Sequence, residues 1–162
     1  RDIVLGGAGG DTITVNAGET TTAPDGNNIV IGDHGLIDYL SEEQALAVAA
    51  NPVRPNDIDR IWSTDTALGG NDVIVTGVAN DIVIGGQGSD TVNASRGSNL
   101  VFGDSALLTA APFDDPATKW AAHEFTVCDI ETTGFVDGGN DTIDGSDGND
   151  VIFGGAGNDI IR

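Results

Sequence analysis

The chain has 162 residues and a formal net charge of −20, because 26 acidic side chains outnumber six basic ones. This charge argues against nucleic acid or an anionic membrane surface as a partner. No run of about 18 apolar residues is present that could cross a bilayer. Aromatic residues make up only 5% and Met is absent, so the core has to be built in thin layers from Val, Ile and Leu.

Asp and Gly dominate the remaining composition, with 21 Asp and 24 Gly. This pairing disfavours helices and favours tight turns with exposed carboxylate and carbonyl oxygens, which are ligands for hard cations. The single cysteine, Cys128, excludes an internal disulfide, and we interpret it as an isolated packed thiol rather than a zinc ligand. The chain begins at Arg1 without a signal peptide, so we expect it to be a segment of a longer protein.

The chain repeats at two periods. Residues 69–92 and 138–161 align without a gap at an offset of 69 residues. Along the whole chain, an Asp or Asn recurs every nine residues, apart from the insertions, at Asp2, Asp11, Asn28, Asp72, Asp81, Asp90, Asn99, Asp141, Asp150 and Asp159. Val or Ile stands two residues after every one of these positions. The unit is G-G-x-G-x-D-x-U-x, where U is a large aliphatic residue, and residues 6–14 and 85–93 match it in full.

This spacing predicts a solenoid. Six turn-forming residues leave three residues for a short strand centred on U, and such strands are stable only when successive turns stack about 4.8 Å apart. Two units close one circuit, so Asp72 stacks near Asp90 and Asp141 near Asp159. Carboxylates about 5 Å apart repel by roughly 1 kcal/mol in water and more in the protein. A divalent cation reverses that sign, and the flexible oxygen coordination of calcium suits these turns better than the strict octahedron of magnesium.

The nonapeptide unit resembles the RTX, or hemolysin-type, family of calcium-binding repeats, and the resemblance covers more than half of the chain. It implies an all-β solenoid, a parallel β-roll with several calcium ions between stacked turns. Each ion takes carbonyls from positions two and four and the Asp of one turn. It takes carbonyls from positions one and three and the Asp of the next turn on that side.

Carried onto this chain, the resemblance implies one site at Leu68, Gly70, Asp72, Gly85, Gln87 and Asp90. A second site consists of Asp137, Gly139, Asp141, Gly154, Ala156 and Asp159. A third uses Gly77, Ala79, Asp81, Ala94, Arg96 and Asn99, and we expect it to be weaker or empty because a neutral Asn replaces Asp. Two incomplete sites are Asp150 with Ser146 and Gly148, and Asp2 with Ala23, Asp25 and Asn28. The alternative, in which these Asp residues only cap turns, stays open.

The register is interrupted twice, after IVIGDHG (29–35) and LVFGDSA (100–106). In the first excursion a capping box at 41–44 and an apolar run at 45–50 predict a short helix, which Asn51-Pro52 ends. In the second, Asp115-Pro116 predicts a short helix over 117–124. We expect strands at 36–40, 58–64, 106–110 and 125–131. Tyr39, Trp62 and Trp120 lie in the excursions, where rings either cover the side of the roll or form a ligand-binding surface.

The Gly-Asp pairs that open the excursions are interpreted as modified calcium turns. Gly32 and His34 would complete the Asp11 site with Gly7 and Gly9, and Gly103 and Ser105 would complete the Asp90 site with Gly86 and Gly88. Asp33 or Asp104 would supply the missing carboxylate. Gly103-Asp104-Ser105 is similar to the GDS block of some esterases, but His34 holds the equivalent position of the first repeat, which argues against a nucleophilic serine. His34 and His123 occupy unrelated positions, so a histidine metal site is not indicated.

We therefore expect one continuous solenoid with RTX blocks at 1–32, 68–103 and 137–162 and two small α/β insertions at 33–67 and 104–136. The resemblance implies a secreted bacterial protein, exported by a type I system, that folds on binding calcium at the cell surface or outside the cell. The long repeat favours a structural and interaction module of an adhesin or surface-layer protein, with neighbouring repeats or cell-surface ligands as partners. The alternative is an accessory domain of a type I secreted protease, lipase or epimerase.

No catalytic residue is expected. A third reading, binding of ice or carbohydrate, needs a regular array, and Thr12, Thr91 and Thr142 recur too sparsely for ice.

Overall fold

The computed structural model describes residues 1–16, 18–20, 22–23, 26–39, 58–111 and 126–162. These residues form strands and turns, and no helix occurs among them. The predicted all-β architecture is confirmed. The two predicted helices, at 41–50 and 117–124, and Trp120 and His123 lie outside the described residues. The described parts of the two insertions are strands and turns, so they give no support to the expected α/β character.

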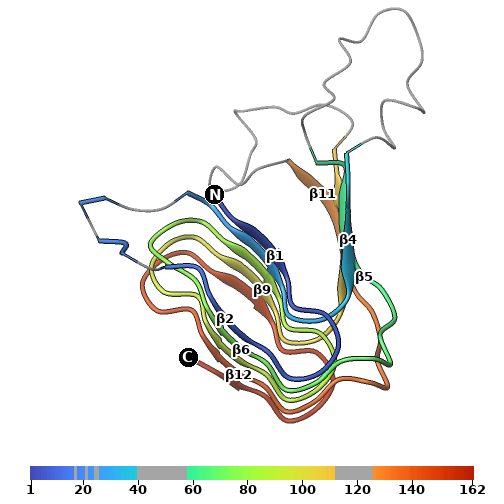
Figure 1. Ribbon diagram of the computed structural model, residues 1–162. Helices are drawn as coiled ribbons and strands as arrows, with labels where there is room; N and C mark the ends of the chain where they lie inside the picture. The colour runs from blue at the N-terminus through green and yellow to red at the C-terminus, as the bar shows by residue number, and fades with distance from the viewer. Residues whose placement is uncertain (17, 21, 24–25, 40–57, 112–125) are drawn as a thin grey trace, which may run out of the picture.

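Two parallel sheets form the body of the molecule (Figure 1). The first sheet has the order β1, β3, β7, β9, β13, with bounds Ile3–Leu5, Ile29–Ile31, Ile82–Ile84, Leu100–Phe102 and Val151–Phe153. The second has the order β14, β12, β8, β6, β2, with bounds Ile160–Ile161, Thr142–Asp144, Thr91–Asn93, Val73–Val75 and Thr12–Thr14. Strands whose residues are 18 apart pair in register, as Val83 does with Val101. The nine-residue unit is therefore half a circuit of the roll.

The aliphatic U residues fill the space between these two sheets. Val83 and Val101 of the first sheet and Ile74, Val92 and Ile143 of the second are each 1% exposed or less and belong to one cluster. Each strand contributes one such side chain because alternate residues of a strand point to opposite faces.

A third sheet is antiparallel and comes from both excursions. Its order is β11, β10, β5, β4, with bounds Val127–Thr132, Ala106–Ala110, Arg60–Ser63 and Gly35–Asp38. The four strands that the sequence predicts in the excursions are thus present, 106–110 with the predicted ends and the other three with shifted ends. The two excursions join where Leu108 of β10 pairs with Ile61 of β5. In Figure 1, β4, β5 and β11 stand beside the first sheet.

The third sheet buries the outer face of the first sheet. Ile31, Ile84 and Phe102 are at most 1% exposed and cluster with Ile61 and Leu108. The Phe102 ring stacks on Phe153 of β13 with centroids 4.9 Å apart. First-sheet strands therefore read as continuous apolar triplets such as IVI and LVF, whereas second-sheet strands such as TIT and TVN are apolar only at their centre. Burial on both faces accounts for the difference.

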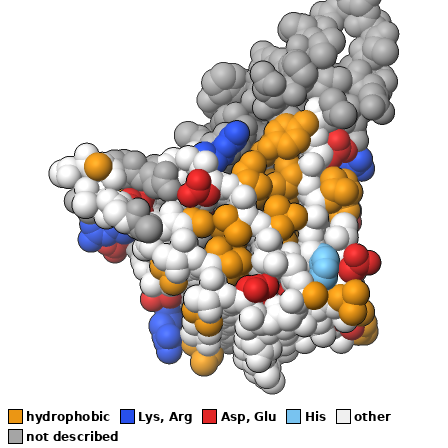
Figure 2. Space-filling view, in the orientation of Figure 1, with side chains coloured by type: hydrophobic (Ala, Val, Ile, Leu, Met, Phe, Trp, Pro, Cys, Tyr) orange, Lys and Arg blue, Asp and Glu red, His pale blue; other side chains and the backbone are white. Residues whose placement is uncertain are grey.

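The cover of the first sheet is incomplete. Ile3 and Leu5 of β1 remain 40% and 44% exposed, and hydrophobic side chains gather between β1 and the third sheet in Figure 2. Tyr39 packs against the hydrophobic cluster beneath the third sheet, which agrees with the alternative that aromatic rings of the excursions cover the side of the roll. The guanidinium of Arg60 lies 5.1 Å from the Trp62 ring centroid. The packing predicted for Cys128 is wrong, because this free thiol is exposed on β11.

Acidic side chains hold the interrupted turns to the turns beside them. The Asp33 carboxylate accepts hydrogen bonds from the N–H of Gly70, where the chain returns from the excursion, and of Gln87 in the next turn. Asp104 repeats this arrangement with the N–H groups of Gly139 and Ala156. Each carboxylate thus joins the two ends of an excursion to the adjacent turn.

Glu19 acts in the same way in the third interrupted turn, residues 15–28. Its Oε1 accepts a hydrogen bond of 2.6 Å from the N–H of Val78, the third residue of the neighbouring turn. Gln87 and Ala156 are also third residues of their turns. In each of the three interrupted turns, a carboxylate therefore accepts a hydrogen bond from the backbone N–H of the third residue of the neighbouring turn.

We predict that Phe102→Ala lowers the free energy of unfolding by about 3–5 kcal/mol, because a buried aromatic side chain would leave a cavity between the first and third sheets. The matched control is Phe135→Ala, since Phe135 is 73% exposed, with an expected change within about 0.5 kcal/mol. Urea unfolding in saturating calcium measures both. Equal losses would contradict the packing of the third sheet on the first.

We predict that Asp33→Ala costs about 2 kcal/mol of stability, because two partly buried N–H groups lose their acceptor. Asp147→Ala is the control: its carboxylate pairs with Arg96, but its side chain is 81% exposed, and exposed ion pairs contribute little. The same urea titrations compare the two variants. A loss for Asp33→Ala no greater than for Asp147→Ala would show that the carboxylate does not hold the excursion.

Candidate metal centre

The turns of the roll lie at two edges. Turns that lead from the first sheet to the second form what we call the glycine edge, at 6–11, 32–72, 85–90, 103–141 and 154–159. The parts of these segments that adjoin the two parallel sheets stack at the lower right of Figure 1, where the third sheet leaves the roll. Turns that lead back form the side-chain edge, at 15–28, 76–81, 94–99 and 145–150.

A ladder of five aspartates runs along the glycine edge. Its rungs are hydrogen bonds from the backbone N–H of one Asp to Oδ1 of the next, with lengths of 2.7 to 3.0 Å, through Asp11, Asp72, Asp90, Asp141 and Asp159. Asp72 stacks on Asp90 and Asp141 on Asp159, as the 18-residue spacing predicts. The ladder also stacks Asp11 on Asp72 and Asp90 on Asp141, across the two excursions.

The second carboxylate oxygen has no hydrogen-bond partner in four of these residues. Oδ2 of Asp11, Asp72, Asp90 and Asp141 is buried and unpaired. Burial, together with the neighbouring carboxylates of Asp141 and Asp72, raises the pKa of Asp90 to about 8, although the hydrogen bond from the Asp72 N–H lowers it. Burial likewise raises the pKa of Asp72 and of Asp141 to about 6. The folded roll therefore disfavours these negative charges unless something positive approaches them.

Each unpaired oxygen faces a backbone carbonyl across a space that only glycine leaves open. A Cβ added to Gly32 would collide with Asp72 Oδ2 and with the carbonyl oxygen of Gly85. The same arrangement recurs at Gly6 with Asp11 and Gly32, at Gly85 with Asp90 and Gly103, and at Gly103 with Asp141 and Gly154. Carboxylate and carbonyl oxygens converging on one space are the donors that calcium takes in proteins.

Carbonyl oxygens are needed to complete any such site. Among the residues that the structure describes, no group of three or more His, Cys, Asp and Glu side chains could hold a metal by itself. Zinc and other metals that prefer nitrogen or sulfur therefore find no suitable donor set there. When bound, calcium would neutralise the stacked carboxylates and join adjacent turns, while the Asp residues and the first-position glycines of this chain hold it.

The structure places the predicted ligands unequally around these spaces. In the first set, Asp72, Asp90 and the Gly85 carbonyl lie together at the glycine edge. Leu68 is 58% exposed, and its carbonyl oxygen lies 3.0 Å from His34 Nδ1. In the second set, Asp141, Asp159 and Gly154 lie together, whereas the N–H of Asp137 donates to the Gly134 carbonyl.

In both sets, glycine-rich segments pack against the turn beside them. Gly88 lies against the carbonyl oxygen of Gly70, and Gly139 against that of Gly88. The N–H groups of Gly70, Gly139, Gln87 and Ala156 donate to Asp33 or Asp104.

The modified turns bring Gly32 to Asp11 and Gly103 to Asp90, as the sequence predicts. Asp33 and Asp104 lie against Gly86 and Gly155 and accept backbone N–H groups rather than facing a neighbouring Asp. Gly7 and Gly9 have φ of 103° and 91°, which favours glycine. The Ser105 carbonyl accepts the N–H of Thr133. Sequence reasoning missed Glu19. The only signal in the sequence is that an acidic residue lies within the interrupted turn at 15–28.

The remaining predicted ligands lie at the side-chain edge. Asp2, Asn28, Asp81, Asn99 and Asp150 form a second ladder with bonds of 2.7 to 3.0 Å. Gly77 lies against Glu19, and the carbonyl oxygen of Ala79 lies against Gly97, whose own carbonyl lies against Gly148. Ala94 is fully buried, and the side chain of Arg96 pairs with Asp147. All these ligand sets remain predictions.

A family model supports the interpretation of the turns. The model described as RTX calcium-binding nonapeptide repeat matches four copies, at residues 1–19, 66–104 and 135–162. No curated protein and no solved structure matches the chain. The matched residues cover more than half of the sequence, include the glycine-edge Asp residues and leave out most of both excursions. The chain therefore belongs to the family of RTX calcium-binding nonapeptide repeats.

Proposed function

We propose that this chain is a structural and interaction module of an extracellular bacterial protein, and that it folds when calcium binds outside the cell. The observation that carries the proposal is the ladder of buried Asp residues with unpaired Oδ2 atoms facing glycine carbonyls. RTX repeat proteins are typically secreted, which supports an extracellular site of action. The described residues include no helix that is long and apolar enough to cross a membrane.

Electrostatics supports coupling between folding and calcium. Asp72 and Asp90 are each 1% exposed in the folded roll, yet the chain carries a net charge of −20. Without cations, folding has to bring these charges together and bury them, which costs more than a thin aliphatic core of three-residue strands can offset. Calcium bound to the folded state alone would supply the difference.

The long repeat favours an adhesin or surface-layer role over an accessory domain of a secreted protease, lipase or epimerase. Two excursions at equivalent positions build one third sheet, so the larger repeat is a structural unit that suits an extended array. We propose no catalytic activity for this segment, with neighbouring repeats or cell-surface ligands as its partners. A catalytic domain encoded in the same gene would favour the enzyme alternative.

We predict that removing calcium with EDTA abolishes most of the far-ultraviolet circular dichroism of the β-sheets, because the stacked carboxylates lose their counter-ions. Adding calcium restores the signal cooperatively, whereas magnesium at the same concentration does not, since its octahedral geometry fits these turns poorly. An unchanged spectrum after complete metal removal would contradict calcium-coupled folding and leave turn capping as the role of the Asp residues.

We predict that Gly85→Ala raises the calcium concentration at the folding midpoint by about tenfold or more, a loss of about 1.4 kcal/mol or more. The added methyl group would fill the space between Asp90 Oδ2 and the Gly103 carbonyl. Native mass spectrometry separates this effect from simple strain, because a blocked site lowers the number of bound ions by one. A full complement of ions at an unchanged midpoint would rule out this space as a calcium site.

A further inference from the structure

The first residue of each turn distinguishes the two edges. At the glycine edge it is Gly in all five turns. At the side-chain edge it is Val15, Thr76, Ala94 and Gly145. Val15 is 8% exposed, and Thr76 and Ala94 are fully buried. Three of these four turns therefore carry a side chain at the first position. At the glycine edge this position has no side chain, and its absence leaves the space beside each Asp.

The carbonyl oxygens at this position are also engaged differently. Thr76 Oγ1 donates a hydrogen bond of 3.1 Å to the carbonyl of Ala94. Ser95 Oγ donates one of 3.2 Å to the carbonyl of Thr76. These two carbonyls correspond to those of Gly85 and Gly103, which face unpaired carboxylate oxygens at the other edge. At the side-chain edge, hydroxyl groups thus donate hydrogen bonds to these carbonyl oxygens. At the glycine edge, the equivalent carbonyl oxygens are left available to a cation.

Charge is distributed differently as well. Along the second ladder Asn alternates with Asp, so no two carboxylates are adjacent rungs. Asn99 Nδ2 donates a hydrogen bond of 3.0 Å to Asp150 Oδ1. The repulsion between adjacent carboxylate rungs that a divalent cation relieves at the glycine edge is therefore absent from this ladder, although the Glu19 carboxylate still repels that of Asp81.

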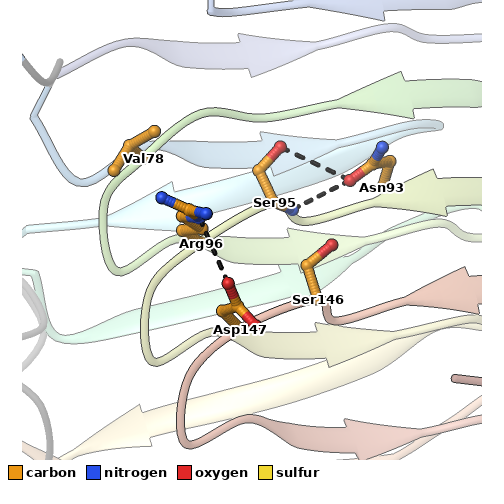
Figure 3. Close-up of a pocket in the computed structure, with 6 residues that line it drawn as sticks. All are labelled: Val78, Asn93, Ser95, Arg96, Ser146 and Asp147. Atoms are coloured by element: carbon orange, nitrogen blue, oxygen red, sulfur yellow. Dashed lines mark hydrogen bonds and ion pairs between the residues drawn. The ribbon is translucent and has the colours of Figure 1, made fainter. Parts of the chain in front are cut away.

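A basic side chain joins two turns of this edge directly. Arg96 Nε lies 3.2 Å from Asp147 Oδ2 of the next turn, over a pocket lined by Val78, Asn93, Ser95 and Ser146 (Figure 3). The N–H of Ser95, whose φ is 56°, donates to Asn93 Oδ1 at 3.0 Å and steadies this turn. Side-chain donors of three kinds, hydroxyl, amide and guanidinium, therefore connect the turns.

Among the described residues of this edge, Asp81 is the carboxylate that resembles the glycine-edge set. It is fully buried, and its Oδ2 has no hydrogen-bond partner. Its neighbours in the ladder are the neutral Asn28 and Asn99, however, and the first residue of its own turn is Thr76. The Ala94 carbonyl that would complete a site already accepts the Thr76 hydroxyl.

We infer that calcium binds this roll at the glycine edge alone, between successive turns, and that side-chain donors close the opposite edge without a metal. The inference rests on the proposed calcium binding. It assigns four ion positions, beside Asp11, Asp72, Asp90 and Asp141. It assigns none to Gly77, Ala79, Asp81, Ala94, Arg96 and Asn99, the third set that the family resemblance implies.

A matched pair of variants tests this assignment, Asp90→Asn and Asp81→Asn. Both side chains are at most 1% exposed, both accept a backbone N–H through Oδ1, and both have an unpaired Oδ2. Calcium is added to the metal-free chains, and bound ions are counted by native mass spectrometry. We expect four ions in the parent chain, three in Asp90→Asn and four in Asp81→Asn.

A crystal of the parent chain grown in calcium chloride provides a test that does not depend on a variant folding. Anomalous difference density should mark ions at the glycine edge and none between the turns 76–81 and 94–99. An ion beside Asp81, or the loss of an ion in Asp81→Asn, would overturn the one-edge assignment while leaving calcium binding intact. A parent chain that binds no calcium at all would instead refute the proposed function.

Discussion

Like charges stacked within a folded interior are the constraint on which this structure depends. The solenoid repeats at the spacing between neighbouring strands, so a residue type that occurs once per circuit meets itself again one layer away. For the valines and isoleucines at the U positions this repetition builds a core. For the aspartates it builds a column of carboxylates, in which Asp72, Asp90 and Asp141 each have one oxygen engaged by a backbone N–H and the other left without a partner. The same periodicity that makes the fold possible therefore places carboxylates in adjacent layers, and the calcium ions of the proposed function would relieve their repulsion.

The circuit of two nonapeptides means that odd and even units experience different surroundings. Units that end in the first sheet have apolar residues on both sides of U, because the third sheet covers that face. Three of the five units that end in the second sheet carry Thr, Asn or Asp beside U, whereas β6 carries the partly exposed Val73 and Val75 there. The turns follow the same parity, with glycine and Asp at one edge and, at the other, larger first residues in three of four turns and alternating Asn and Asp. A consensus averaged over all units hides this division, which appears only when units are compared at an 18-residue spacing.

Much of the roll follows from the sequence alone. The register of Asp, Asn and U residues predicts the three-residue strands, their parallel pairing and the stacking of Asp72 on Asp90, because each depends on local spacing. The third sheet could not be predicted in the same way, since Ile61 and Leu108 belong to different excursions and nothing local specifies that they pair. Counting back four residues from Asp72 and Asp141 assigns Leu68 and Asp137 to the second position of their turns. In the folded chain Asp33 and Asp104 lie at this second position, because each excursion is inserted directly after the Gly-Asp pair.

The carboxylates that close the interrupted turns have a consequence for how such a solenoid can be elaborated. Asp33 and Asp104 join the departing and returning ends of an excursion within a single layer, so the axial rise of the roll is the same whether a turn has six residues or many more. The length and composition of the inserted segment are then uncoupled from the stacking of the layers. Each Gly-Asp pair is therefore a position at which an inserted segment can add surface to one edge of the roll, once per large repeat, without altering the pitch of the roll.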